Sequence, residues 1–422
     1  MFVFPRGLLA RYLISLFCLL PAMAQAGERL SLDDAQSIAL ARDLEIARLD
    51  ARREAMGERA IAAAQLPDPG VKLGLMSVPV DSFALDQEPM TQMVVGAQQM
   101  FPAGETRSLR KEQILVQSQV QTAMADDRRR QVVAQLRRLW IELAYKETAA
   151  RVQRSQLELY QGLSDTVETR YTAGRGGQQD IVRVELEQNM LQENLIALKR
   201  DSAALRSNLS EWIGEAAFGE LDLDGLVLPE LPAQDSLAPR IADNPMVLAD
   251  RVQMEASQVG EQLASQRYKP DWGVEVSYGI RDGVDPMGVS RPDFFSAMVM
   301  FSVPMFTGDR QDRMVAAAEA DTRAALSQVK NRQRTLLARV QAAYERYTAQ
   351  QEMLALYREE VLPASRANVI ATLNAYQGQR ASFDEYIRAE NMALEKTLRV
   401  ARLTADSLAA QAEILYLAGD TQ

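Results

Sequence analysis

The chain of 422 residues contains no histidine and a single cysteine, Cys18. Without histidine there is no Ser-His-Asp triad, no zinc site built on imidazole and no imidazole general base. Cys18 lies in an apolar stretch near the N-terminus, and we expect it to leave with a cleaved leader, which removes the thiol as well. These absences argue against an enzyme, and we expect no cofactor and no resident metal ion.

Basic charge is also scarce, because 47 Lys and Arg residues face 57 Asp and Glu residues. A net charge of −10 argues against nucleic acid as a partner, since nucleic-acid binding normally needs a basic face. Glycine (22) and proline (16) are too few for a disordered or collagen-like chain, while 47% hydrophobic residues suffice for a large core. We therefore expect an ordered protein with a function other than catalysis.

Residues 1–26 have the three parts of a secretory signal peptide: two arginines, an apolar run, and the cleavage motif Ala24-Gln25-Ala26. Lipid attachment at Cys18 is an open alternative, although the bulky Phe17 before it fits that reaction poorly. No later segment has the ~18 consecutive apolar residues of a membrane helix. We therefore expect an exported protein that would need strands to cross a membrane.

Several short motifs occur twice, about 200 residues apart and in the same order, which indicates a tandem duplication. We predict a first repeat over 27–213, a linker over 214–238 and a second repeat over 239–422. The matching motifs are Pro67 to Val71 with Pro270 to Val274, Met100-Phe101 with Met305-Phe306, and Tyr171 and Gly174 with Tyr376 and Gly378.

Each repeat follows the same pattern of helix, strand pair, very long helix, turn and return helix. In the first repeat, apolar periodicity predicts a helix over about 31–66, strands within 70–101, a proline-free helix over 105–171 and a return helix over 179–213. The 105–171 helix would be roughly 100 Å long, which suits a tube or a coiled coil.

The second repeat predicts helices over about 239–268, 309–376 and 383–417, with a strand pair within 272–304. Pro363 lies inside the long helix and should kink or interrupt it.

Four strands per chain are too few to close a barrel, and open strand edges are costly in lipid. Three chains would contribute twelve strands, within the range of outer-membrane barrels. The fold class predicted is therefore mainly α with a small β part: duplicated long helices forming a tunnel, and four strands that join a twelve-stranded trimeric transmembrane barrel. An ordinary sheet edge in a soluble protein is the alternative.

These features together resemble the TolC-type outer-membrane efflux proteins over nearly the whole mature chain. Leu32-Asp33-Asp34-Ala35 resembles the start of the family's first helix, and Asp243-Asn244-Pro245 resembles its recurring Asn-Pro. Asp43-Leu44 departs from that pattern in the first repeat. The turns after Tyr171 and Tyr376 resemble the helix-to-helix turns of the family.

The resemblance implies a homotrimer in the outer membrane, with the helical part in the periplasm. It also implies a periplasmic adaptor and an inner-membrane pump, of the RND type, as partners. The loop residues within 77–99 look like the heavy-metal-efflux branch, so metal cations are the expected cargo, with drugs or secreted polypeptides as alternatives. A soluble periplasmic adaptor or scaffold without a pore is the alternative function.

The two helix-to-helix turns carry the candidate site. In a trimer, Asp180, Asp384 and Glu385 would ring a narrow opening and select cations. By resemblance, Tyr376 and Arg380 would hold the second turn against Gln179 and Asp180 and close the periplasmic gate. The exposed turns would also dock the adaptor. The residues expected to do so are Gly174, Arg175, Gly176, Gly177 and Gly378.

Overall fold

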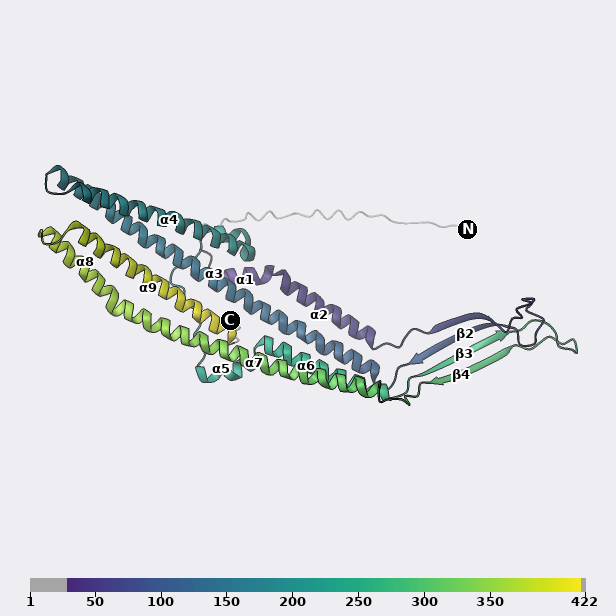
Figure 1. Ribbon diagram of the computed structural model, residues 1–422. Coiled ribbons are helices and arrows are strands. Elements are labelled where there is room, and N and C mark those ends of the chain that lie inside the picture. The colour runs from purple at the N-terminus through teal and green to yellow at the C-terminus, as the bar shows by residue number, and fades with distance from the viewer. Residues whose placement is uncertain (1–28, 419–422) are drawn as a thin grey trace, which may run out of the picture.

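The computed structural model describes residues 29–418, and it is elongated, with a helical bundle at one end and a sheet at the other (Figure 1). The predicted leader over 1–26, with Cys18, lies outside the described residues. No helix within residues 29–418 is both long and apolar enough to cross a lipid bilayer.

The first repeat contains four α-helices and two strands in the predicted order. They are α1 (Leu32–Arg42), α2 (Leu44–Ala63), β1 (Gly70–Met76), β2 (Gln92–Phe101), α3 (Thr106–Thr172) and α4 (Gln178–Ile213). Helix α3 has 67 residues and is therefore about 100 Å long. Figure 1 shows α4 beside one half of α3 and α2 beside the other half, so two short helices flank one long helix.

The second repeat has the same order of elements. They are α5 (Leu237–Ala242), α6 (Pro245–Ser265), β3 (Trp272–Ile280), β4 (Phe294–Phe301), α7 (Gln311–Leu356), α8 (Leu362–Gln377) and α9 (Phe383–Leu417). One turn of π-helix, Tyr357–Val361, separates α7 from α8. Pro363 is the second residue of α8, directly after this turn, and its missing N–H accounts for the predicted interruption, which is confirmed.

The continuous helix predicted over 31–66 is wrong, because the chain breaks at Asp43. This residue has extended backbone angles, and its carboxylate accepts a hydrogen bond from the backbone N–H of Ile46 at 2.8 Å. The predicted 239–268 helix is broken in the same way, since Asn244 caps α6 by accepting from the N–H of Met246 at 2.9 Å. Asp43 thus has the same capping role in its repeat as Asn244, although no proline follows it.

The four strands form one antiparallel sheet in the order β1-β2-β3-β4, so its centre joins the two repeats. The register places an apolar row on one face, and a polar or small row one residue away on the other. The apolar row is Leu73, Val95, Tyr278 and Phe295. The other row is Lys72, Gly96, Ser277 and Ser296. The outer edges of β1 and β4 have no partner strand within the described chain.

Three apolar clusters hold the helices together. The largest surrounds Trp140 of α3, which is fully buried and donates a hydrogen bond from Nε1 to the carbonyl of Asp222 at 3.0 Å. A second cluster joins α7 to the end of α9, and a third lies near the helix-to-helix turns. The third cluster includes Tyr160, Val184 and Ile387, so it joins α3, α4 and α9. The mainly helical fold with a four-stranded sheet confirms the predicted fold class at the level of one chain.

Candidate functional site at the helix-to-helix turns

The α3–α4 and α8–α9 turns lie at the end of the bundle farthest from the sheet (Figure 1). Every candidate residue predicted from the sequence is on one of these two turns or in the helical turn directly before or after it, and Tyr376 lies in the last turn of α8. The structure places the two turns at the same end of the molecule, as the duplication requires.

The first turn ends α3 with a left-handed glycine. Gly174 has φ +71°, and its N–H donates to the carbonyl of Tyr171 at 2.9 Å. The N–H of Arg175 donates to the carbonyl of Arg170 at 2.8 Å. This pair of bonds is a Schellman motif, which favours glycine at the left-handed position. Glycine at position 174 therefore adopts the turn geometry without the backbone strain that another residue would meet.

The second turn has the same bonds but places its glycine one residue earlier. The N–H of Gln379 donates to Tyr376 at 3.0 Å, and the N–H of Arg380 donates to Ala375 at 2.8 Å. The left-handed residue is Gln379, with φ +57°, whereas Gly378 has φ −81°. Gly378 therefore does not supply the left-handed conformation of its turn, whereas Gly174 does. The backbone of Gln379 is held in a left-handed conformation that costs a non-glycine residue roughly 1 kcal/mol.

The side chains of the first turn are open to solvent, while its glycines Gly176 and Gly177 are half-buried. Arg175 and Gln179 are exposed, and Gly177 is the N-cap of α4. A Cβ added to Gly177 would lie only 2.2 Å from the side-chain amide of Gln179, so these two residues are packed tightly. Gly176 meets no such obstacle. The turn therefore presents one cation, Arg175, on a compact backbone.

Tyr376 joins the two turns. The guanidinium carbon of Arg170, in the last turn of α3, lies 4.7 Å from the centre of the Tyr376 ring. On its own hairpin, Tyr376 packs against Phe383 and Tyr386, with ring centres 5.5 and 6.2 Å away. Burial raises the pKa of Tyr376, Arg170 opposes that rise, and the carboxylate of Asp180 adds to it. The sequence patterns place Tyr376 at this contact but do not point to Arg170.

Arg380 does not share that contact. Its side chain lines a shallow groove of its own hairpin, between α8 and α9, together with Glu385 and Arg388. The structure therefore brings Tyr376 close to the first turn and places Arg380 along the second hairpin.

The three acidic candidates have different surroundings. Asp384 is half exposed and pairs with Arg388 at 2.9 Å and with Arg183 of α4 at 3.7 Å. Glu385 forms a capping box with Ser382: its carboxylate accepts from the Ser382 N–H at 2.7 Å, and these hydrogen bonds lower its pKa. Asp180 lies in the first turn of α4, partly buried, where it complements the helix dipole. Asp180 thus keeps the least compensated charge of the three.

A network of buried side-chain hydrogen bonds, on the sheet side of the turns, connects the two hairpins. Tyr160 of α3 donates to the side-chain oxygen of Asn391 at 2.7 Å, and the Asn391 amide donates to Glu187 of α4 at 3.0 Å. Glu187 is only 6% exposed and also binds Arg183 at 2.9 Å. Burial raises the pKa of Tyr160, so its hydroxyl stays protonated. No sequence motif indicates this hydrogen-bonded network. Helical spacing shows only that Asp180, Val184 and Glu187 share one face of α4.

The comparisons with known proteins concern the fold and one repeat. The model of the outer membrane efflux protein family matches residues 240–420. No curated protein matches the chain in sequence.

Solved structures match almost the whole chain. The outer membrane protein VceC of Vibrio cholerae is 16% identical with a TM-score of 0.75, over 92% of this chain and 96% of VceC. The MtrE outer membrane channel of Neisseria gonorrhoeae is 14% identical with a TM-score of 0.75, over 92% and 88%. The structure of CusC, described in terms of transmembrane channel formation, is 10% identical with a TM-score of 0.75, over 92% and 91%.

At these identities the structures establish the fold, and the family model independently covers the second repeat. The resemblance inferred from the duplicated motifs is therefore confirmed: residues 240–420 match the outer membrane efflux protein family, and the described chain has the fold of the TolC-type channels.

Proposed function

We propose that this chain is the outer-membrane exit channel of a tripartite efflux system and acts as a homotrimer. The observation that carries the proposal is the sheet, which has one apolar face and two unpaired edges. The helical bundle would extend from the sheet into the periplasm, and the channel would conduct cargo passively.

The apolar face is exposed in a single chain. Val71, Leu73 and Phe295 are 73%, 76% and 73% exposed, although such side chains gain roughly 1.5–3 kcal/mol each on leaving water. The opposite face is the more polar one: it carries an ion pair between Lys72 and Glu275, which suits contact with water, beside the exposed Met298. A sheet that is apolar on one face and polar on the other is typical of a membrane barrel wall, with lipid outside and an aqueous lumen inside.

The unpaired edges explain why three copies are needed. Strands β1 and β4 each have one row of backbone N–H and C=O groups without a partner strand within residues 29–418. In lipid each unsatisfied group costs several kcal/mol, so the edges must pair. Pairing β1 of one copy with β4 of the next closes a ring, and three copies of the four-stranded sheet contribute twelve strands.

The far end of the bundle suits contact with other proteins. Helix α3 has 67 residues and holds the turns about 100 Å from the sheet. The exposed Arg175 and the compact glycine turns offer a surface for a periplasmic adaptor, which would connect the channel to an inner-membrane pump of the RND type. Gly378 belongs to this surface, although it does not itself set the turn.

Heavy-metal cations are the cargo we propose. The support is the loop between β1 and β2, whose Pro79 to Phe83 and Glu88 to Thr91 segments resemble the heavy-metal branch. A periplasmic opening ringed by the carboxylates of Asp180, Asp384 and Glu385 would favour cations. Asp384 pairs with two arginines whereas Asp180 does not, so Asp180 should dominate any selectivity.

Two measurements test the proposal. Outer-membrane fractionation followed by electrophoresis should show a heat-sensitive trimer, and planar bilayers should show channels; a periplasmic monomer without conductance would instead support the soluble scaffold. In bilayers, Asp180→Ala should reduce cation preference and sensitivity to trivalent blockers more than Asp384→Ala. If both variants keep the cation preference of wild type, the acidic periplasmic opening is contradicted, but the proposal of a channel is not.

A further inference from the structure

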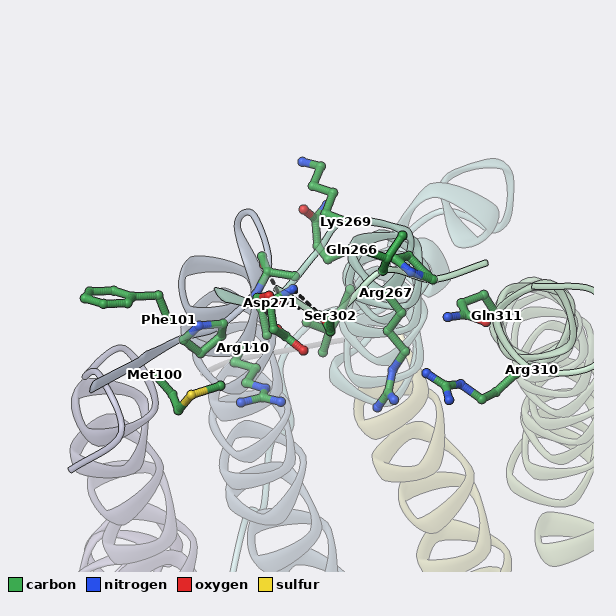
Figure 2. A pocket seen from close by; sticks show the side chains of 16 residues that line it. Met100, Phe101, Arg110, Gln266, Arg267, Lys269, Asp271, Ser302, Arg310 and Gln311 are labelled. Carbon is green, nitrogen blue, oxygen red and sulfur yellow. Dashed lines mark hydrogen bonds between the residues drawn. The ribbon is translucent and has the colours of Figure 1, made fainter. Parts of the chain in front are cut away.

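A cavity of about 450 Å³ lies where the sheet meets the helical bundle (Figure 2). Its walls come from the end of β2, the starts of α3 and α7, the end of α6, and the segment after β4. In the proposed channel this is the level at which strands leave the membrane and helices enter the periplasm.

Three arginines from separate elements line the cavity: Arg110, Arg267 and Arg310. Figure 2 shows Arg267 and Arg310 pointing toward one another, with Arg110 pointing in the same direction as Arg267, while Lys269 points away. None of the three arginines forms an ion pair within residues 29–418. The one carboxylate in the wall, Asp271, is engaged by the N–H of Ala103 at 2.7 Å.

This convergence of positive charge is unexpected in a chain with ten excess acidic groups. Like charges that face one another repel unless an anion lies between them. The helices α3 and α7 also direct their N-termini to the cavity, through Thr106 and Gln311, and each terminus adds partial positive charge. Gln311 is only 2% exposed, its side-chain oxygen has no hydrogen-bond partner, and Figure 2 shows the amide directed toward Arg267.

The surroundings indicate that the anion is part of an amphiphile. Val303 lines the cavity and is 70% exposed, and the neighbouring Met305 and Phe306 are 74% and 89% exposed. Phe101, which lies on the apolar face of the sheet, also lines the cavity. A lipid would therefore place its acyl chains along this apolar surface and its headgroup among the arginines.

We infer that this cavity binds the phosphate group of a phospholipid. Guanidinium groups bind phosphate oxygens through paired, charge-assisted hydrogen bonds, and Arg267 and Arg310 are placed to hold one phosphate from two sides. The side-chain nitrogen of Gln311, which Figure 2 shows on the side facing Arg267, can donate a further hydrogen bond, whereas its unpartnered oxygen can only accept one. The inference rests on the proposed function, because only a membrane-embedded sheet brings this cavity to the headgroup level.

The test uses the purified full-length trimer in detergent, with native mass spectrometry as the readout. The probes are dioctanoyl phosphatidylglycerol, dioctanoylglycerol without phosphate, and inorganic phosphate. The variant Arg267→Gln/Arg310→Gln removes two cavity charges. The matched control Arg323→Gln/Lys330→Gln removes two exposed charges of α7 away from the cavity.

Wild-type protein and the control should bind the phosphate-bearing lipid equally, and the cavity variant at least tenfold more weakly. Dioctanoylglycerol should bind to wild-type protein at least tenfold more weakly than dioctanoyl phosphatidylglycerol does. Equal binding of both lipids, or equal lipid binding by wild type and the cavity variant, would overturn the inference. Inorganic phosphate binding as tightly as the lipid would assign the site to a free anion and also overturn it.

Conductance of the same preparations separates this inference from the proposed function. A wild-type trimer that conducts but shows no preference for the phosphate-bearing lipid contradicts the lipid site alone. A preparation that forms neither trimer nor channel contradicts the proposed function, and the lipid assignment fails with it.

Discussion

The guanidinium of Arg170 lies 4.7 Å from the ring centre of Tyr376, and this contact joins the turns of two hairpins that belong to different repeats. A cation over an aromatic ring contributes about 0.5–1 kcal/mol at an exposed site. The contact is small enough to be broken by a partner protein and placed where its loss would separate the two turns.

Removing that contact should make it easier for the two helix-to-helix turns to separate. We expect Arg170→Gln to raise the open probability of the channel in planar bilayers, because about 0.5–1 kcal/mol corresponds to a roughly two- to fivefold shift in a two-state equilibrium. Tyr376→Phe is the control, since it keeps the ring and loses only the hydroxyl. Equal open probability in Arg170→Gln and wild type would show that this contact does not hold the turns.

The two turn glycines should respond differently to alanine. Gly174 has φ +71° with open space around its Cα, so Gly174→Ala should cost about 1 kcal/mol through backbone strain alone. Gly378 has φ −81°, and Gly378→Ala should be close to neutral, although its new Cβ would lie 3.3 Å from the Asn374 carbonyl. Hydrogen exchange at the N–H groups of Arg175 and Arg380 measures each turn separately. Similar acceleration in both variants would contradict the assignment of the left-handed residues.

Asp43 should matter for stability beyond its cap. Its carboxylate is 4% exposed and binds Arg128 through two nitrogens at 2.9 and 3.1 Å. Asp43→Asn retains a capping side chain but loses the charge, and should cost about 1 kcal/mol; Asp43→Ala loses both and should cost about 2–3 kcal/mol. The measurement is the apparent Tm of the trimer in detergent. Equal Tm in the two variants would show that the charge and the cap do not contribute separately.

The same residue predicts a pH dependence. Burial raises the pKa of Asp43, but hydrogen bonds from Arg128 and from the N–H of Ile46 outweigh burial, so its folded pKa is below the unfolded value. Its contribution is therefore fully present above the unfolded pKa of about 3.9 and is lost as the pH falls through the lower folded value. The Tm difference between wild type and Asp43→Asn should persist at pH 6 and shrink below about pH 4. A difference that is constant down to pH 3 would contradict this cause.

The sequence is most informative where local patterns decide the structure. The proline-free apolar periodicity over 105–171 predicts α3, observed as Thr106–Thr172, and the twofold alternation predicts the strands. The break at Asp43 is not predicted because an aspartate inside a helical pattern has no proline after it to mark a cap. Gln379 is not predicted as the left-handed residue because the adjacent Gly378 is the default choice for that conformation.

The long-range parts of the sites have no local signature. Tyr160, Glu187 and Asn391 come together only because α3, α4 and α9 cross near the turns. Arg267 and Arg310 likewise face one cavity from segments on either side of the β3–β4 pair. Such constellations depend on how helices pack, which sequence periodicity does not specify.

The most direct test of a trimeric membrane channel is disulfide cross-linking between β1 of one copy and β4 of the next. The only cysteine, Cys18, lies in the predicted leader, so Leu73→Cys can be combined in turn with Phe295→Cys, Ala297→Cys and Val299→Cys. At least one pair should give a covalent trimer in outer membranes, reversed by reductant, whereas each single variant stays free of trimer. Oxidation that yields only monomer for every pair, in protein recovered from the outer membrane, would contradict closure of the sheet through these two edges.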